Sequence, residues 1–167
     1  MRRAMIVAVL AAAATAGPSA AQQSQLDGHG NYQRSNHSHQ SAWGAGANYG
    51  LSFGGQNAPV KLNPSVGADY VKQEGGDQKQ VSTNFDLALQ FSVGPLFSPY
   101  AGGSVGANWQ SSGDGFGGAK LGLQYILGAQ LKLQADAPYS LIADVRPGYV
   151  RGQEHSTTVR FGVQFSL

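Results

Sequence analysis

The stretch that decides the fold is residues 119–135, AKLGLQYILGAQLKLQA, in which every second position is apolar. Its odd positions carry only Ala, Leu and Tyr, whereas its even positions carry Lys, Gly, Gln and a single Ile. Successive side chains of a β-strand point to opposite faces of a sheet, so this alternation predicts a long strand with one apolar face. Because helical periodicity is almost absent beyond the N-terminus, we expect an all-β protein.

Six further segments alternate in the same way, and runs rich in Gly, Pro, Asn and Asp punctuate the chain between them. One face of each segment is apolar, whereas Gly, Ser, Asn and Gln gather on the other together with every charge inside the strands. The segments are residues 43–54, 60–70, 81–93, 97–109, 141–149 and 159–167. The charges on the polar face are Lys61, Asp69, Asp86, Lys120, Lys132, Asp136, Asp144, Arg146 and Arg160.

Two architectures fit strands with one apolar face. In a soluble barrel or sandwich the apolar face forms the core, whereas in a membrane barrel it contacts lipid and the polar face fills the lumen. We favour the membrane barrel over a soluble secreted β-protein because the polar face is small and Gly-rich, as a narrow lumen requires. Its five cations and four anions nearly cancel, which suits paired charges in a confined space. Six aromatic residues lie near strand ends, where interfacial girdles form: Trp43, Phe53, Tyr70, Phe97, Trp109 and Tyr149.

The composition of the 167-residue chain agrees with one small domain of this kind. Gly accounts for 24 residues, charged residues for only 12% and hydrophobic residues for 41%, which is the reverse of the balance found in disordered chains. The chain has no Cys, which excludes a disulfide scaffold, a thiolate zinc site and a thiol nucleophile.

Residues 1–21 have the three zones of a cleaved secretory signal peptide. Arg2 and Arg3 precede an apolar run at residues 4–14 and a small-x-small end at residues 19–21. The run is too short to span a bilayer as a helix. Cleavage removes two of the 11 Lys and Arg residues and leaves nine, equal to the nine Asp and Glu, so the mature chain is neutral. The mature chain has no basic patch that could bind nucleic acid. The signal peptide leads us to expect export, with the bacterial outer membrane as the destination.

The connections between segments alternate between short and long. Because outer-membrane barrels have short turns on the periplasmic side and longer loops outside, this alternation predicts which connections face the periplasm. With the last strand running inward, segment 43–54 also runs inward, so an even strand count needs an earlier strand between Gln22 and about Arg34. The alternative, splitting 119–135 into two strands, is disfavoured because its register never slips. We therefore predict an eight-stranded antiparallel up-and-down transmembrane β-barrel. Its divisions are the signal peptide at 1–21, a polar N-terminal segment with a weak first strand and outer loop at 22–40, and the barrel at 41–167.

The stretch PYAGGSVGANW at residues 99–109 resembles the small bacterial outer-membrane β-barrel family that includes OmpA transmembrane domains, OmpX and opacity-type proteins. Residues 128–149 and the C-terminal strand resemble it next, and the likeness covers about residues 41–167. It implies delivery by periplasmic chaperones and the barrel-insertion machinery. The family usually ends its last strand with Phe or Tyr as the insertion signal. Here Phe161 and Phe165 keep the spacing and Leu167 ends the chain.

One group of residues has metal-ligand character. His37 and His39, with His29 nearby, would place two imidazoles on the same side of a strand. We favour a polar segment outside the membrane, because no carboxylate ligand lies close to the histidine pair. We therefore expect no metal and no cofactor.

Residue types for hydrolysis occur in two places. The family resemblance extends to eight-stranded barrels that edit lipid A with His, Ser and a carboxylate, and Glu154-His155-Ser156 and His39-x-Ser41 offer these side chains. Adjacent residues on a strand point in opposite directions, so Glu154, His155 and Ser156 could converge only in an irregular loop. We therefore expect no catalysis.

The function expected from the sequence is that of an integral outer-membrane protein with a structural or surface-exposed role. An eight-stranded barrel is just wide enough for its side chains to fill it, so we interpret the charges of the polar face as a plugged ionic core. Outer-membrane lipid or lipopolysaccharide is the expected partner, and the sequence identifies no surface ligand. The alternatives are a small porin-like channel and, as a third candidate, a lipid-modifying enzyme.

Overall fold

The computed structural model describes residues 22–54, 58–111, 115–135, 137–153 and 155–167. Within these ranges the chain forms eight strands, and no helix is long and apolar enough to cross a bilayer. The strands are β1 (Gln22–Ser35), β2 (Ser41–Phe53), β3 (Val60–Gln73), β4 (Lys79–Phe91), β5 (Phe97–Ser111), β6 (Lys120–Leu131), β7 (Tyr139–Val150) and β8 (Ser156–Ser166).

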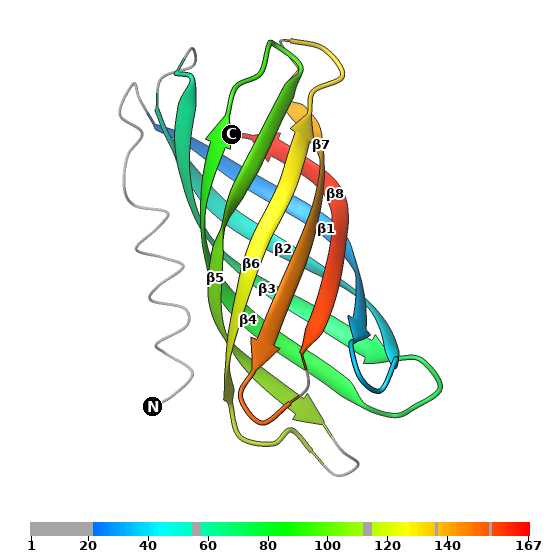
Figure 1. Cartoon of the computed structure of the whole chain (residues 1–167). Coiled ribbons are helices and arrows are strands. Elements are labelled where there is room, and N and C mark those ends of the chain that lie inside the picture. The colour runs from blue at the N-terminus through cyan, green and yellow to red at the C-terminus, as the bar shows by residue number, and fades with distance from the viewer. Residues whose placement is uncertain (1–21, 55–57, 112–114, 136, 154) are drawn as a thin grey trace.

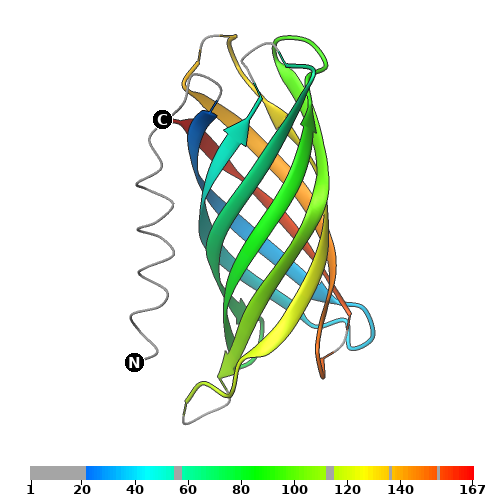
Figure 2. The ribbon, with the colours of Figure 1, turned by 90° about the vertical axis from the view of Figure 1, so that its left-hand side faces the viewer.

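The eight strands form one closed sheet. Each strand pairs antiparallel with the next one in the sequence, and β8 pairs with β1 (Figure 1). The strands are steeply tilted relative to the barrel axis, as closure of a narrow barrel requires (Figure 2). This topology confirms the prediction of an eight-stranded antiparallel up-and-down barrel.

The first strand and the long alternating stretch explain the even strand count. The weak strand expected between Gln22 and about Arg34 is present as β1, whose register with β2 and β8 is continuous. Residues 119–135 contribute a single strand, β6, so the alternative of two strands is wrong. The strand ends at Leu131 although the alternation continues to Ala135, because residues 132–135 bend toward the next connection.

Both ends of the described chain lie at the same end of the barrel. The amide of Leu167 donates to the carbonyl of Ser24 (2.9 Å), and we name this the terminal end and the opposite one the distal end. The three connections at the terminal end have six, five and seven residues, and the four at the distal end have five, five, eight and five. The expected alternation of short and long connections is therefore wrong. Strands β3, β4 and β8 continue through polar residues that the sequence pattern assigned to loops.

The two faces of the sheet have the reverse polarity of a soluble barrel. Among the described residues, only five hydrophobic side chains are buried, and 16 polar or charged residues are buried with them. Large apolar side chains point outward and are exposed along the strands, for example Phe85 (47%), Leu87 (46%) and Leu123 (54%). A polar interior surrounded by an apolar exterior is the arrangement of membrane barrels.

The aromatic residues singled out in the sequence lie on the outward face. Trp43, Tyr70, Trp109 and Tyr149 lie toward the distal ends of their strands, and Phe53 and Phe97 lie at the terminal end. Trp43 contacts Tyr32 of the neighbouring strand, with 4.6 Å between ring centroids. At the C-terminus, Phe161 and Phe165 point outward from β8, whereas Leu167 follows the strand.

Candidate functional site: the closed lumen

Arg146 of β7 joins two carboxylates in the middle of the lumen. Its Nη1 donates to Oδ2 of Asp86 on β4 (2.7 Å), and its Nε donates to Oδ1 of Asp144 (2.8 Å). These three side chains are at most 6% exposed. Tyr100 of β5 donates to the other oxygen of Asp144 (3.0 Å). Because β5 and β6 separate β4 from β7, these contacts bridge the lumen.

Arg160 of β8 extends this network to the opposite wall. Its Nη1 lies 3.8 Å from Oδ2 of Asp86, and its Nη2 lies 3.8 Å from Oδ1 of Asp27 on β1. The guanidinium side chain is only 3% exposed. Asp86 thus faces both arginines, so removing its carboxylate takes one anionic partner from each of two buried guanidinium groups, which is costly.

A histidine on β1 completes the charged layer. Nδ1 of His29 lies 2.6 Å from Oδ1 of Asp27, and its Nε2 lies 2.8 Å from Oδ1 of Asp69 on β3. Arg160 Nη2 lies 2.8 Å from the same Nδ1. The fully buried ring therefore touches two carboxylates and one guanidinium. We name these seven residues the ionic layer: Asp27, His29, Asp69, Asp86, Asp144, Arg146 and Arg160.

Glycine provides the space in which this layer forms. Gly46 of β2 pairs with His29 on one side and with Asp69 on the other, so the histidine reaches across the glycine to the carboxylate. A Cβ at Gly46 would collide with the carboxylate oxygen of Asp69 and would lie 2.6 Å from Nε2 of His29. The Gly-rich polar face predicted from the sequence thus has a steric role at this position.

A second layer of amides crosses the lumen nearer the terminal end. Gln130 of β6 donates to Gln164 of β8 (2.9 Å) and to the hydroxyl of Ser140 (2.6 Å), and it accepts from Gln90 of β4. The chain of hydrogen bonds continues to the walls at β3 and β1, where Asn63 donates to Gln90 (2.7 Å) and Gln164 donates to Gln25 (2.8 Å). We name these residues the amide layer: Gln25, Asn63, Gln90, Gln130, Ser140 and Gln164.

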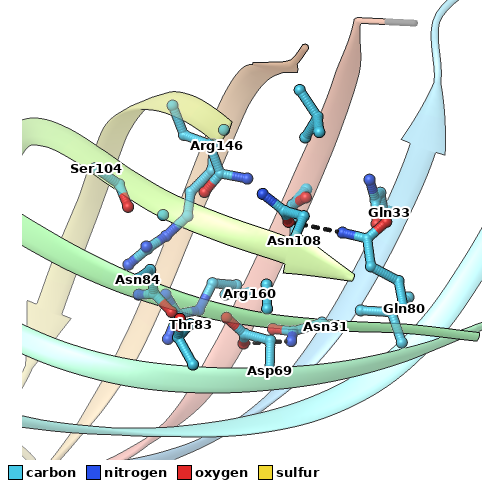
Figure 3. A pocket seen from close by; sticks show the side chains of 17 residues that line it. Asn31, Gln33, Asp69, Gln80, Thr83, Asn84, Ser104, Asn108, Arg146 and Arg160 are labelled. Carbon is cyan, nitrogen blue, oxygen red and sulfur yellow. Dashed lines mark hydrogen bonds between the residues drawn. The ribbon is translucent and has the colours of Figure 1, made fainter. Parts of the chain in front are cut away.

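The remaining lumen is divided into small cavities. One cavity of about 40 Å³ lies on the distal side of the ionic layer, and Figure 3 shows the side chains that line it. A second cavity of about 70 Å³ lies between the ionic and amide layers. Arg146 and Arg160 line both cavities and so separate them. Asn31 and Asn84 line the first cavity, and their Oδ1 atoms have no hydrogen-bond partner within the described residues. Each cavity is large enough for water molecules that would bond such polar groups.

The distal mouth is wider and is lined mostly by uncharged side chains, together with Lys79. Above the first cavity lies a vestibule of about 360 Å³, lined chiefly by Gln and Ser and including Gln33 and Gln80 at its floor. Gln33 donates to Ser156 (3.0 Å) and Gln80 to Asn108 (3.0 Å), so the lining side chains also bond one another. The opening therefore narrows toward the ionic layer.

The structure separates the charges expected in the lumen into two groups. Asp69, Asp86, Asp144, Arg146 and Arg160 meet in the ionic layer. The lysines do not join them: Lys61 is half-buried at the terminal end, Lys120 is half-buried at the distal end, and Lys132 lies beyond β6 and donates to the carbonyl of Ala135 (3.5 Å). Asp136 lies outside the described residues.

Sequence reasoning missed several members of the lumen. Asp27 and His29 were not expected there because β1 has few apolar residues from which to set a register. The signal was on the other face, where Gln25, Asp27, His29, Asn31 and Gln33 are polar at every second position. His29 therefore lies apart from the exposed His37 and His39, and within the described ranges no group of three or more His, Asp or Glu could hold a metal ion.

The candidate hydrolytic residues make other contacts. The hydroxyl of Ser41 lies 3.0 Å from the hydroxyl of Tyr32, and Ser156 faces the lumen and accepts from Gln33. His155 packs outside against Tyr149, with 5.2 Å between ring centroids. Glu154 lies outside the described residues. Neither hydroxyl bonds an imidazole in the part of the chain that the structure describes.

The fold is similar to that of several solved barrels. No protein-family model and no curated protein matches the chain. Neisserial surface protein A has a TM-score of 0.60 at 17% identity, over 88% of this chain and 97% of that one. Ail, the attachment invasion locus protein of Yersinia pestis, also has a TM-score of 0.60 at 14% identity, over 87% and 97%. The outer-membrane enzyme PagL has a TM-score of 0.50 at 19% identity, over 88% and 99%. The chain therefore has the fold of the small eight-stranded outer-membrane β-barrels.

Proposed function

We propose that this protein is an integral outer-membrane protein whose lumen is closed and whose role is structural or surface-exposed. The observation that carries the proposal is the contact of Asp86 with Arg146 and Arg160, from the opposite wall of the barrel. The amide layer closes the lumen a second time. Hydrated ions would have to displace both layers, so the barrel does not conduct.

The exterior of the barrel supports the membrane location. Exposed Leu, Val and Phe side chains cover the outward face of the strands, and buried polar groups fill the inside. In water such an exterior would be an aggregation-prone patch far larger than monomeric proteins expose. In a bilayer the same side chains contact acyl chains, and the closed sheet leaves no unpaired backbone edge. Periplasmic chaperones and the barrel-insertion machinery would deliver the chain.

We place the terminal end at the periplasm and the distal end outside the cell. A signal peptide at residues 1–21 brings the chain to the periplasm, where β1 then begins. The distal connections, together with the vestibule, would face the surroundings. The name of Ail describes attachment and invasion, and surface contact through the distal connections is the corresponding role for this chain.

Planar-bilayer recording of the refolded protein tests the closed lumen. We expect no steady conductance steps, whereas a general porin reconstituted in parallel gives them. The heat-dependent gel shift of folded barrels serves as the control for folding. Reproducible ion-sized steps from the folded protein would contradict the proposal and support the porin-like alternative.

The enzymatic alternative has its own test. PagL shows that this fold carries an outer-membrane enzyme, but here Ser41 and Ser156 bond Tyr32 and Gln33 instead of histidine. We expect the lipid A mass spectrum of an expressing strain to be unchanged. A mass shift that disappears in His155→Ala or His39→Ala would establish catalysis.

A further inference from the structure

The charges on the outward face of the strands have one sign. In the described residues, all strand Asp side chains point into the lumen, and the outward positions carry only Arg34, Lys72 and Lys79. All three lie at or next to the distal end residue of their strands, β1, β3 and β4. The outer wall is therefore apolar along its length and basic at its distal rim.

Two of these cations are direct neighbours. Lys72 of β3 is the register partner of Lys79 of β4 at outward positions, both side chains are exposed, and Lys79 also borders the distal vestibule. Directly opposite residues of an antiparallel pair have Cβ atoms about 5 Å apart, so like charges there repel each other. Among the described residues no carboxylate lies within 4.0 Å of either lysine to offset this repulsion. An external anion bound between the two ammonium groups would offset this repulsion.

The residues next to the lysine pair indicate its depth in the membrane. The row continues from Lys72 to Trp43 on β2 and from Trp43 to Tyr32 on β1, and the two rings are in contact. Trp and Tyr concentrate at the level of lipid headgroups, where one part of the ring is apolar and the other is wet. The two ammonium groups therefore lie at the same level as the headgroups of the surrounding lipid.

We propose that Lys72 and Lys79 bind a phosphate group of a phosphorylated lipid headgroup in the outer leaflet. The inference rests on the proposed membrane location and orientation, and it adds the residues and the ligand chemistry. A phosphate is the anion that suits the site because its oxygens accept from both ammonium groups at once. Clusters of Lys and Arg at a membrane surface bind anionic lipid in this way.

Two acidic residues lie near the site but farther along the chain. Glu74 follows the end of β3, where its amide donates to the carbonyl of Ser41 (2.8 Å), and Asp77 lies in the following turn. Glu74 lies two residues beyond Lys72 toward the distal turn, and both line one surface hollow with Trp43 and Asp77. A headgroup that rises from the bilayer therefore meets the lysines before the carboxylates.

Titration of the folded protein in neutral detergent micelles tests this site. The probes are lipid A carrying two phosphates, the same lipid with both phosphates removed, and inorganic phosphate. The variant Lys72→Gln/Lys79→Gln should bind phosphorylated lipid A about 30-fold more weakly, which is about 2 kcal/mol, since each basic residue near an anionic surface contributes about 1 kcal/mol. The matched control is Lys61→Gln/Lys132→Gln, which removes two positive charges at the other end of the barrel.

The outcomes separate this proposal from the proposed function. Weak binding of dephosphorylated lipid A, and unchanged affinity in the control variant, support the site. An equal loss of lipid A affinity in both double variants would show a general charge effect and overturn the proposed site. Inorganic phosphate that competes at the same concentration as the lipid would also overturn it. Outer-membrane fractionation and the gel shift of each variant report on the membrane location independently, so a barrel that inserts normally but does not prefer phosphorylated lipid contradicts only this inference.

Discussion

Asp86 of β4 and Arg160 of β8 approach within 3.8 Å although three strands separate them on either side of the barrel. Contact between opposite walls means that the lumen is no wider here than two side chains. Arg146 binds the same carboxylate from β7 at 2.7 Å. Charge pairing thus does in this barrel what an apolar core does in a soluble protein: it fills the interior and connects strands that share no backbone hydrogen bonds.

The pair of Asp86 and Arg146 should contribute strongly to stability. We expect Arg146→Met to lower the free energy of unfolding by about 3–5 kcal/mol, because it leaves two buried carboxylates without their main partner. In a double-mutant cycle with Asp86→Asn, the two effects should be non-additive by about 1–3 kcal/mol. Urea unfolding in lipid vesicles, followed by tryptophan fluorescence, measures both. Arg151→Met removes an exposed arginine and should stay within about 0.5 kcal/mol of the unmodified protein. Additive effects would mean that the pair does not interact.

The glycine between His29 and Asp69 provides a steric test of the ionic layer. Gly46→Ala should destabilise the barrel by about 1–3 kcal/mol, because the new methyl group overlaps the Asp69 carboxylate, forces the pair apart and lies only 2.7 Å from the backbone carbonyl oxygen of Ala68. Gly28→Ala is the matched control on β1, since a Cβ there meets no atom within 4 Å, and it should be neutral to within about 0.5 kcal/mol. The same unfolding assay compares them. Equal stability of the two variants would show that His29 and Asp69 are not held as described.

The fold was predictable because it depends on a pattern of period two. The apolar positions of residues 119–135 set which face of β6 points outward, and the parity of the strand count required β1 before any contact was known. The pattern does not indicate where the pairing between neighbouring strands ends. Backbone hydrogen bonds continue between polar residues as well as apolar ones, so β3 and β4 extend to Gln73 and Lys79. The connections at the two ends of the barrel therefore span similar ranges of length.

The ionic layer was less accessible to sequence reasoning. Alternation places Asp86 and Arg146 on the polar face, but 60 residues separate them, and their contact depends on closure of the sheet and on strand tilt. The partner of each charge is thus a property of the register rather than of the local sequence. Lys61 and Lys120 share the same face and make no contact with the ionic layer, because their places at opposite strand ends lie outside it.

Cysteine labelling tests which end of the barrel is outside the cell. The chain has no Cys, so single substitutions give an unambiguous signal. His37→Cys in the distal connection 36–40 should react with a membrane-impermeant maleimide on intact cells. Val93→Cys, 60% exposed in the native chain at the terminal end, should react only after the outer membrane is opened. The opposite pattern would reverse the orientation and remove the outer-leaflet site from the distal rim.

Lipid contact of the outward face has a consequence that a soluble barrel would not share. Val105 is 42% exposed near the middle of β5, and in water an arginine at such a position changes stability by no more than about 0.5 kcal/mol. In a membrane barrel Val105→Arg should cost about 2–4 kcal/mol, because the charge lies near the bilayer midplane. Leu133→Arg, which lies beyond β6 at the terminal end and is 54% exposed in the native chain, should cost at most about 1 kcal/mol. Unfolding in vesicles, with Trp43 and Trp109 as the reporters, measures the difference, and two equally small effects would place the exterior of this barrel in water.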